Sequence, residues 1–216
     1  MKKQYLLPLA ALLMIGAFAS AAWLYNRQQA DQAVEQARAN AELLVRDYSP
    51  RTGNPGARVT LVEFIDPACG TCAVFHPLVK QLMAEHEGRI KLVLRYVPFH
   101  PRADYVVKVL EAARLQGKFW EVLEVALETQ SVWSAHGNPQ PERIWMRLGR
   151  TGLDIQRAQR DMESPEIARR LEQDMADGRA LGVNKTPSFY VNGEPLTRFG
   201  YDTLRQLVQQ EIDASY

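Results

Sequence analysis

The sequence predicts an α/β fold in which a long helical segment separates a strand, helix and strand from a later hairpin. Residues 58–65 and 89–98 are rich in β-branched and aromatic residues and apolar on both alternating faces, which is typical of central strands covered on both sides. Residues 103–181 instead repeat apolar positions at helical spacing. Asn192-Gly193, between two apolar runs, indicates a two-residue hairpin because both turn positions need positive φ.

The size and charge of the chain limit the classes of function to consider. With 216 residues and 46% hydrophobic content, it can form one packed domain with appendages. Its 26 Lys and Arg against 25 Asp and Glu give a net charge of +1, and hence no general reason to bind nucleic acid. Two cysteines are too few for a disulfide scaffold. We therefore expect function to come from a local site and predict no nucleic-acid partner.

Residues 1–26 are expected to direct export. Two lysines precede an uncharged, mostly apolar stretch that runs from residue 4 to residue 26, as in a secretory signal. Small residues at 17–21 fit a cleavage site, yet the apolar run continues beyond them and is long enough for an uncleaved anchor. The prediction is a periplasmic protein in which residues 5–25 are a cleaved signal or an inner-membrane anchor, with the anchor favoured.

A stalk and a linker are expected between this segment and the folded domain. Residues 27–46 are rich in Ala, Gln, Glu and Arg, with a thin apolar seam, and indicate an exposed helix. Self-association through that seam is an alternative, but sustained heptads are absent and a plain spacer is favoured. Residues 47–57 contain two prolines and two glycines and read as a linker, so 27–57 forms one unit of stalk and linker.

Three further units are expected along the chain. Residues 58–101 hold the two strands with a helix over 72–86 between them, and 102–182 form the helical insertion. Residues 183–216 return to strand character and end in a helix.

The last unit is predicted in more detail. A strand over 187–191 leads into the Asn-Gly turn, and a second strand follows at about 195–199. Asp202 is expected to cap a final helix, because an apolar face begins two residues later. That face comprises Leu204, Leu207, Val208 and Ile212.

Both cysteines lie in the motif Cys69-Gly-Thr-Cys72, directly after a predicted strand and at the start of a predicted helix. The unpaired N–H groups and dipole of a helix N-terminus stabilise a thiolate, so Cys69 is expected to be exposed, with a lowered pKa. Cys72, in the first turn, could then close or open a disulfide. Half of a zinc site has the same spacing, but only His76 could join from the same helix face. Copper or zinc bound by these three residues is the alternative.

Two stretches, "LVEFIDPACGTC" and "GVNKTPSFYVNG", resemble the thioredoxin superfamily and most closely its DsbA-like exported thiol–disulfide oxidoreductases. The resemblance runs from Val59 to the C-terminus and implies a thioredoxin fold with an inserted helical domain. It also implies that Pro187 forms a cis bond facing the cysteines and that Thr186 presents its backbone to substrate. An ordinary trans proline at a strand start is the alternative. This chain has Gly70 and Thr71 where the better known pattern has a histidine, which bears on thiolate stabilisation.

Glu63 stands where the family places a buried acid beneath the cysteine pair. It shares an alternating strand face with apolar residues, where a carboxylate is costly unless it is paired or protonated. The resemblance implies that Glu63 relays protons for Cys72. A strand-edge glutamate that reaches solvent is the alternative.

The resemblance implies an enzyme that needs no cofactor or metal and exchanges its Cys69–Cys72 disulfide with cysteines of exported proteins. Such an enzyme also needs a membrane redox partner that regenerates the active site. The direction is left open by the sequence, because it depends on small differences in thiolate stability. Oxidation is slightly favoured, and a reductase, an isomerase or a copper- or zinc-handling protein is the alternative.

Overall fold

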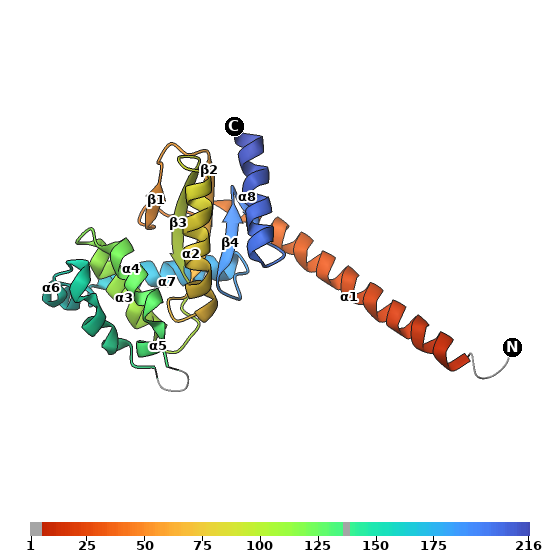
Figure 1. Cartoon of the computed structure of the whole chain (residues 1–216), viewed down its shortest axis with the longest axis horizontal. Helices are drawn as coiled ribbons and strands as arrows, with labels where there is room; N and C mark the ends of the chain where they lie inside the picture. The colour runs from red at the N-terminus through yellow and green to blue at the C-terminus, as the bar shows by residue number, and fades with distance from the viewer. Residues whose placement is uncertain (1–5, 136–138) are drawn as a thin grey trace.

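The computed structural model describes residues 6–135 and 139–216. A mixed sheet has the order β1-β3-β2-β4-β5, and helices lie on both sides of it (Figure 1). The strands are β1 (Arg51–Gly53), β2 (Val59–Ile65), β3 (Ile90–Tyr96), β4 (Ser188–Val191) and β5 (Glu194–Pro195). The helices are α1 (Leu6–Ala39), η2 (Ala41–Leu43), α2 (Gly70–Glu85), α3 (Ala103–Arg114), α4 (Phe119–Glu128), α5 (Gln130–Trp133), η3 (Pro141–Thr151), α6 (Ile155–Asp161), α7 (Pro165–Ala180) and α8 (Tyr201–Ser215).

The two central strands are parallel to each other and are covered on both faces, as predicted. In β2 and in β3 every residue except the second is buried. Figure 1 shows α2 in front of the sheet and α7 crossing behind it, while α8 lies beside β4. Leu61 of β2 faces the larger core, which includes both cysteines, whereas Val62 and Phe64 face a smaller core behind the sheet. This alternation fixes which β2 side chains lie beneath the cysteine pair.

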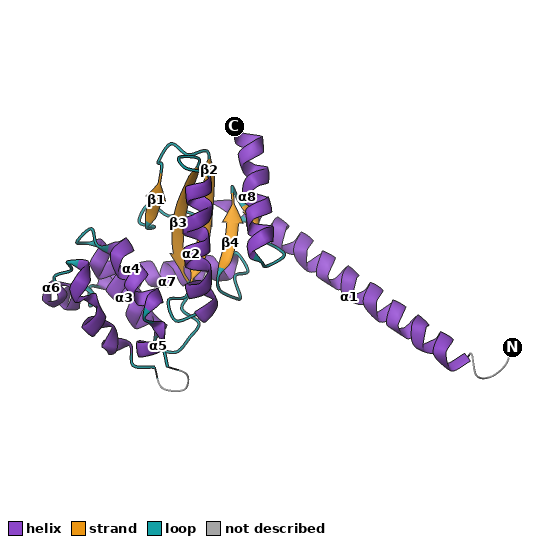
Figure 2. Ribbon diagram, in the orientation of Figure 1, coloured by secondary structure: helices purple, strands orange, loops and turns teal. Residues whose placement is uncertain are grey.

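The predicted helical insertion is confirmed as the run from α3 to α7, between β3 and β4. Its apolar residues join the same core as the cysteines, including Val106, Leu123, Trp133 and Ile144. The helices α3 to α6 therefore share the core on the side of the sheet that carries the cysteines, whereas α7 also runs behind the sheet (Figure 2).

The N-terminal segments differ from the sequence prediction. One continuous helix, α1, runs through the expected boundary at residues 26 and 27 and ends at Ala39, so the stalk helix is shorter than expected. The expected linker over 47–57 contains β1, where Arg51 pairs with Val93 in an antiparallel register. This strand is held by hydrogen bonds to a distant segment, which local Pro and Gly content cannot indicate.

The C-terminal hairpin is confirmed and its flanks are corrected. Asn192 and Gly193 have φ of 50° and 93°, as a turn between two paired strands requires. β5 covers only two residues and not 195–199. The N-cap of α8 is Gly200, and Asp202 lies within the first turn. At that position its negative charge still stabilises the helix, because it lies near the positive N-terminal end of the helix dipole.

The expected export segment is only partly described. Its two lysines lie outside the described residues. Within the described part of the chain, no helix combines the length and apolar character needed to cross a membrane. The α1 helix projects away from the sheet (Figure 1), and its large apolar side chains between Leu12 and Tyr25 are mostly exposed. Export, cleavage and anchoring stay predictions.

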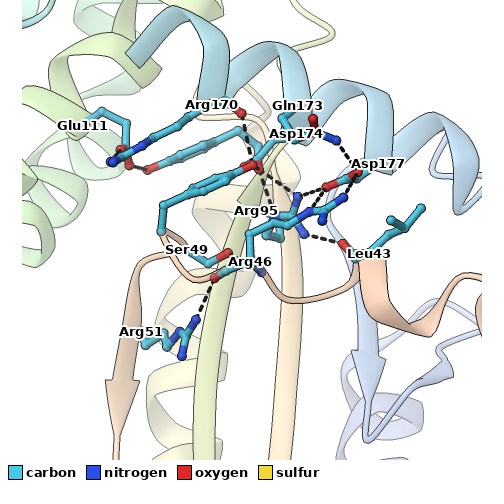
Figure 3. Close-up of polar contacts among 12 residues, drawn as sticks. Leu43, Arg46, Ser49, Arg51, Arg95, Glu111, Arg170, Gln173, Asp174 and Asp177 are labelled. Carbon is cyan, nitrogen blue, oxygen red and sulfur yellow. Dashed lines mark hydrogen bonds and ion pairs between the residues drawn. The ribbon is translucent and has the colours of Figure 1, made fainter. Parts of the chain in front are cut away.

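A buried ion network ties the N-terminal segment and α7 to the sheet (Figure 3). The Arg95 side chain of β3 is 0% exposed, and its Nε and Nη2 atoms lie 3.0 Å from Asp174 Oδ1 and 2.5 Å from Asp177 Oδ2. The guanidinium also donates to the carbonyl of Leu43. Arg46 adds two hydrogen bonds of 2.7 and 2.8 Å to Asp177. Because α7 leads directly into the loop before β4, this network also fixes the start of that loop.

Candidate active site

The cysteine pair lies where β2 meets α2. Cys69 is the N-cap residue of α2, with φ −76° and ψ 118°, and Cys72 lies in the first turn. The turn is closed by the Cys69 N–H, which donates to the Asp66 carbonyl at 3.0 Å. Cys72 is fully buried, as expected for the inner thiol, but Cys69 is only 7% exposed and not the exposed residue that the sequence predicted. Its Sγ contacts the loop that carries Thr186.

The loop before β4 brings Thr186 and Pro187 to this helix end. The Thr186–Pro187 peptide bond is cis. The Thr186 carbonyl oxygen lies 3.3 Å from Cys69 Sγ, although the two residues are 117 positions apart in the sequence. Cys69, Cys72, Thr186 and Pro187 therefore form one cluster at the N-terminus of α2.

The two thiols have opposite acidities. The pKa of Cys69 is lowered to about 5 by hydrogen bonds from the side chains of Cys72 and Thr186 and from the backbone of Thr71 and Cys72, against the desolvation that raises it. The pKa of Cys72 is raised by burial, by its hydrogen bond with Cys69 and by the charge of Glu63. Near neutral pH, Cys69 is thus a thiolate and Cys72 a thiol that donates to it.

Glu63 is buried under this pair, and the alternative of a solvent-reaching carboxylate is wrong. Its side chain is 1% exposed, and its Oε1 atom is buried without a hydrogen-bond partner among the described residues. Burial, with a smaller contribution from the charge of Cys69, raises the pKa of Glu63 to about 8. The carboxyl is therefore mostly protonated at neutral pH and can give up a proton only slightly above it.

Asp66 is a site residue that the sequence analysis missed. Its fully buried carboxylate accepts hydrogen bonds from the backbone N–H of Ala68 at 2.8 Å, of Phe99 at 2.7 Å and of His100 at 2.8 Å. His100 Nδ1 lies 2.7 Å from the same carboxylate. Asp66 thus joins the turn before Cys69 to the loop after β3. The sequence does contain a signal for this turn, since an aspartate before a proline at the end of a strand is typical of turns.

Gln130 of α5 holds the same turn from the insertion. Its Nε2 donates to the carbonyls of Pro67 at 2.6 Å and of Cys69 at 3.0 Å. Nothing in the local sequence around Gln130 indicates this role, because the contact joins residues 61 and 63 positions apart. The turn before Cys69 is therefore hydrogen-bonded both by Asp66, at the end of β2, and by Gln130, in the insertion.

His76 does not join the cysteines. Its Nε2 lies 3.4 Å from Glu124 Oε2, which itself pairs with Lys80 at 2.7 Å. Burial lowers the pKa of His76. Across residues 6–135 and 139–216, no group of three His, Cys, Asp or Glu side chains is placed to hold a metal ion.

A cysteine pair at the start of a helix, beside a cis-proline and on a mixed sheet, defines a thioredoxin-type protein. The chain belongs to the thioredoxin family, whose family model, described as "Thioredoxin", matches residues 46–210. The solved structures with this fold include DsbA-like proteins, so the expected resemblance is confirmed at the level of the fold.

Two solved structures illustrate the match. A thioredoxin-like oxidoreductase from Silicibacter pomeroyi DSS-3 has a TM-score of 0.66 and 29% identity, over 80% of this chain and 94% of that one. The thiol-disulfide exchange protein α-DsbA2 from Wolbachia pipientis has a TM-score of 0.72 and 21% identity, over 85% of this chain and 97% of that one. The second likeness shows the fold alone.

The curated relatives are much longer proteins. A Na(+)/H(+) antiporter NhaA from Herminiimonas arsenicoxydans is 33% identical over 150 residues, which is 69% of this chain but only 23% of the antiporter. The chain therefore spans less than a quarter of the length of this relative.

Proposed function

We propose that this protein is an exported thiol–disulfide oxidoreductase that exchanges a Cys69–Cys72 disulfide with cysteines of protein substrates. The observation that carries the proposal is the opposite acidity of the two thiols, with the pKa of Cys69 near 5 and that of Cys72 raised. This asymmetry makes Cys69 the better leaving group and leaves Cys72 as the protonated resolving thiol.

The proposed reaction needs only the Cys69–Cys72 disulfide and two thiols of the substrate. A substrate thiolate attacks Cys69 Sγ of the disulfide, forms a mixed disulfide and releases Cys72 as a thiolate that must take up a proton. A second substrate thiolate attacks the substrate sulfur of the mixed disulfide and expels Cys69 as a thiolate. The substrate is oxidised to a disulfide by two electrons, and the cysteine pair is reduced to a thiolate and a thiol.

Glu63 is assigned as the proton relay for Cys72 in this reaction. Its buried carboxyl interacts with both cysteines, and its pKa of about 8 lies close enough to neutral for it to give and take a proton. Thr186 and Pro187 are assigned to substrate binding, since the Thr186 carbonyl lies 3.3 Å from the reacting sulfur. An extended substrate segment can add beside this loop in the manner of an added strand.

The lowered pKa of Cys69 favours oxidation as the direction. Stabilising its thiolate stabilises the reduced protein relative to the disulfide, which makes the disulfide a stronger oxidant. The 29% identity to a solved thioredoxin-like oxidoreductase supports the same class of activity. A reductase or isomerase would need the pair to be kept reduced by its partner.

The proposed location is the periplasm. The exposed apolar side chains of α1 between Leu12 and Tyr25 form a surface that is unfavourable in water and fits a segment handled by a membrane during export. A membrane redox partner would reoxidise the cysteines after each turnover. Whether residues 5–25 remain as an anchor is tested by fractionating cells that make the full chain.

Transfer of the disulfide tests the proposed function. Oxidised protein is mixed with an equimolar reduced dithiol peptide, and thiols are blocked and counted by mass spectrometry at successive times. We expect one peptide disulfide to form for each protein disulfide lost. A peptide that stays reduced while the protein stays oxidised would overturn the proposal. Blocking thiols in intact cells then gives the direction: a mostly oxidised pair supports oxidation, and a mostly reduced pair supports reduction or isomerisation.

A further inference from the structure

A groove of about 1000 Å³ lies between α1 and the edge of the sheet next to the cysteine site. One wall is the α1 face from Trp23 to Gln36. The other consists of residues 181–185, the start of β4 and residues 195–198. The walls are held together by Gln36 Nε2, which donates to the Ala180 carbonyl at 2.9 Å.

The groove adjoins the proposed substrate loop. Lys185 and Ser188, which flank Thr186 and Pro187, both line it, and the Ser188 hydroxyl donates to the Lys185 carbonyl at 2.8 Å. The partner strand β5 pairs with Tyr190 and Val191 of β4, and the Leu196 N–H donates to the Phe189 carbonyl at 2.9 Å. Ser188 and Phe189, at the beginning of β4, also line the groove. Residues that line the groove therefore stand directly before and after Thr186 and Pro187 in the chain.

The groove is cationic. The charged residues among its described lining are Arg27, Lys185 and Arg198, and all three are positive. The ion pairs between described residues do not include these three side chains, whereas the nearby Arg38 of α1 is paired with Glu194 at 3.0 Å. The remaining polar lining is mostly amide: Asn26, Gln29, Gln32, Gln36 and Asn184. Cations beside amide donors and acceptors complement an extended backbone with carboxylate side chains.

We propose that this groove binds the acidic polypeptide segment that flanks the reacting cysteine of the substrate. The proposal rests on the proposed function and adds the charge preference of its substrates. Charges at the edge of a binding surface act mainly on association and on its dependence on salt. The preference should therefore weaken as ionic strength rises.

The test uses the oxidised full chain and three reduced dithiol peptides, identical except for four flanking Asp, Ser or Lys residues. The variant R27E/R198E reverses two groove charges, and R147E/R160E makes the same change at two exposed arginines of the insertion. For each peptide, the rate constant of the variant is divided by that of the wild type, which cancels the intrinsic reactivity of the peptide thiols. A small uncharged thiol checks that Cys69 itself is unaltered.

We expect R27E/R198E to slow oxidation of the Asp peptide about 10-fold and to speed that of the Lys peptide, with the uncharged thiol unaffected. R147E/R160E should leave all ratios near one. Equal ratios for the three peptides in R27E/R198E would overturn the inference and leave the proposed function standing. If the three ratios are equal and R27E/R198E also loses binding to phosphatidylglycerol vesicles, the groove binds lipid headgroups instead, which would overturn the inference as well. Failure of every peptide with the wild type would instead reject the proposed function.

Discussion

Two buried acids on opposite sides of the sheet differ in their hydrogen-bond partners and in the direction of their pKa shifts. Glu63 of β2 lies beneath the cysteines with an unpartnered Oε1 atom, and burial raises its pKa to about 8. Asp177 of α7 is just as inaccessible, at 2% exposure, but receives hydrogen bonds from Arg46 and Arg95. Against the desolvation that raises it, those hydrogen bonds lower its pKa. Asp177, whose carboxylate is hydrogen-bonded, stabilises the fold. Glu63, whose Oε1 atom has no partner among the described residues, lies where a group that can give and take a proton is useful.

The largest expected effect is on activity at the cysteine pair. Cys69→Ser should abolish exchange because it removes the attacked sulfur, whereas Cys72→Ser should keep a nucleophile and accumulate mixed disulfides with substrates. Both outcomes are read by non-reducing electrophoresis and mass spectrometry after incubation with a protein disulfide. Mixed disulfides formed through Cys72 in the Cys69→Ser protein would contradict the assigned order of attack.

The ion network should give the largest effect on stability. Arg95→Met removes the cation shared by Asp174 and Asp177 and leaves two buried carboxylates with fewer donors, so we expect a loss of about 3–5 kcal/mol in the free energy of unfolding. Denaturation in urea measures it. The control is Arg157→Met, which breaks an exposed pair with Asp161 and should cost less than about 1 kcal/mol. Equal losses of unfolding free energy in the two variants would show that the buried network stabilises the fold no more than an exposed ion pair does.

Glu63→Gln should stabilise the protein and slow turnover. The folded pKa of about 8 lies above the ordinary 4.5, so the folded state holds more protons than the unfolded state between these values, and stability falls as pH rises through that window. In the disulfide form, where the cysteines do not titrate, Glu63→Gln should gain about 2 kcal/mol or more at pH 8 and little at pH 4. Turnover should fall about 10²-fold with loss of the relay.

A matched variant sharpens this test. Glu111 is a buried glutamate at 2% exposure, but its carboxylate is paired with Arg114 at 2.8 Å and accepts from the Tyr96 hydroxyl at 3.1 Å. Glu111→Gln should therefore lose stability where Glu63→Gln gains it. If both substitutions destabilise the protein at pH 8, Glu63 is a structural residue and not a relay.

The smallest expected effect concerns Gln130. Gln130→Ala removes donors to the carbonyls of Pro67 and Cys69 and should cost about 1 kcal/mol per lost hydrogen bond. The same substitution at the exposed Gln209 of α8, which bonds Asp213 on its own helix, is the control and should change the unfolding free energy by less than 0.5 kcal/mol, about the limit for surface sites. No difference between the two variants would mean that the insertion does not hold the active-site turn.

The sequence predicts what local patterns encode and misses what distant segments supply. The strands around Glu63, the helical insertion and the Asn192-Gly193 turn follow from periodicity and turn chemistry. β1 and the buried Arg95 network depend on pairing across the fold, and nothing local marks them. The low exposure of Cys69 is likewise not marked locally, because Thr186, which contacts its Sγ, lies 117 positions away in the sequence.

Site-resolved alkylation measures the difference in acidity between the two cysteines. Reduced protein is treated briefly with iodoacetamide from pH 3 to pH 9, and each cysteine is quantified by peptide mass spectrometry. We expect Cys69 to be modified with a midpoint near pH 5 and Cys72 to stay unmodified across the range. Modification of both cysteines with one shared midpoint near the ordinary thiol value would contradict it.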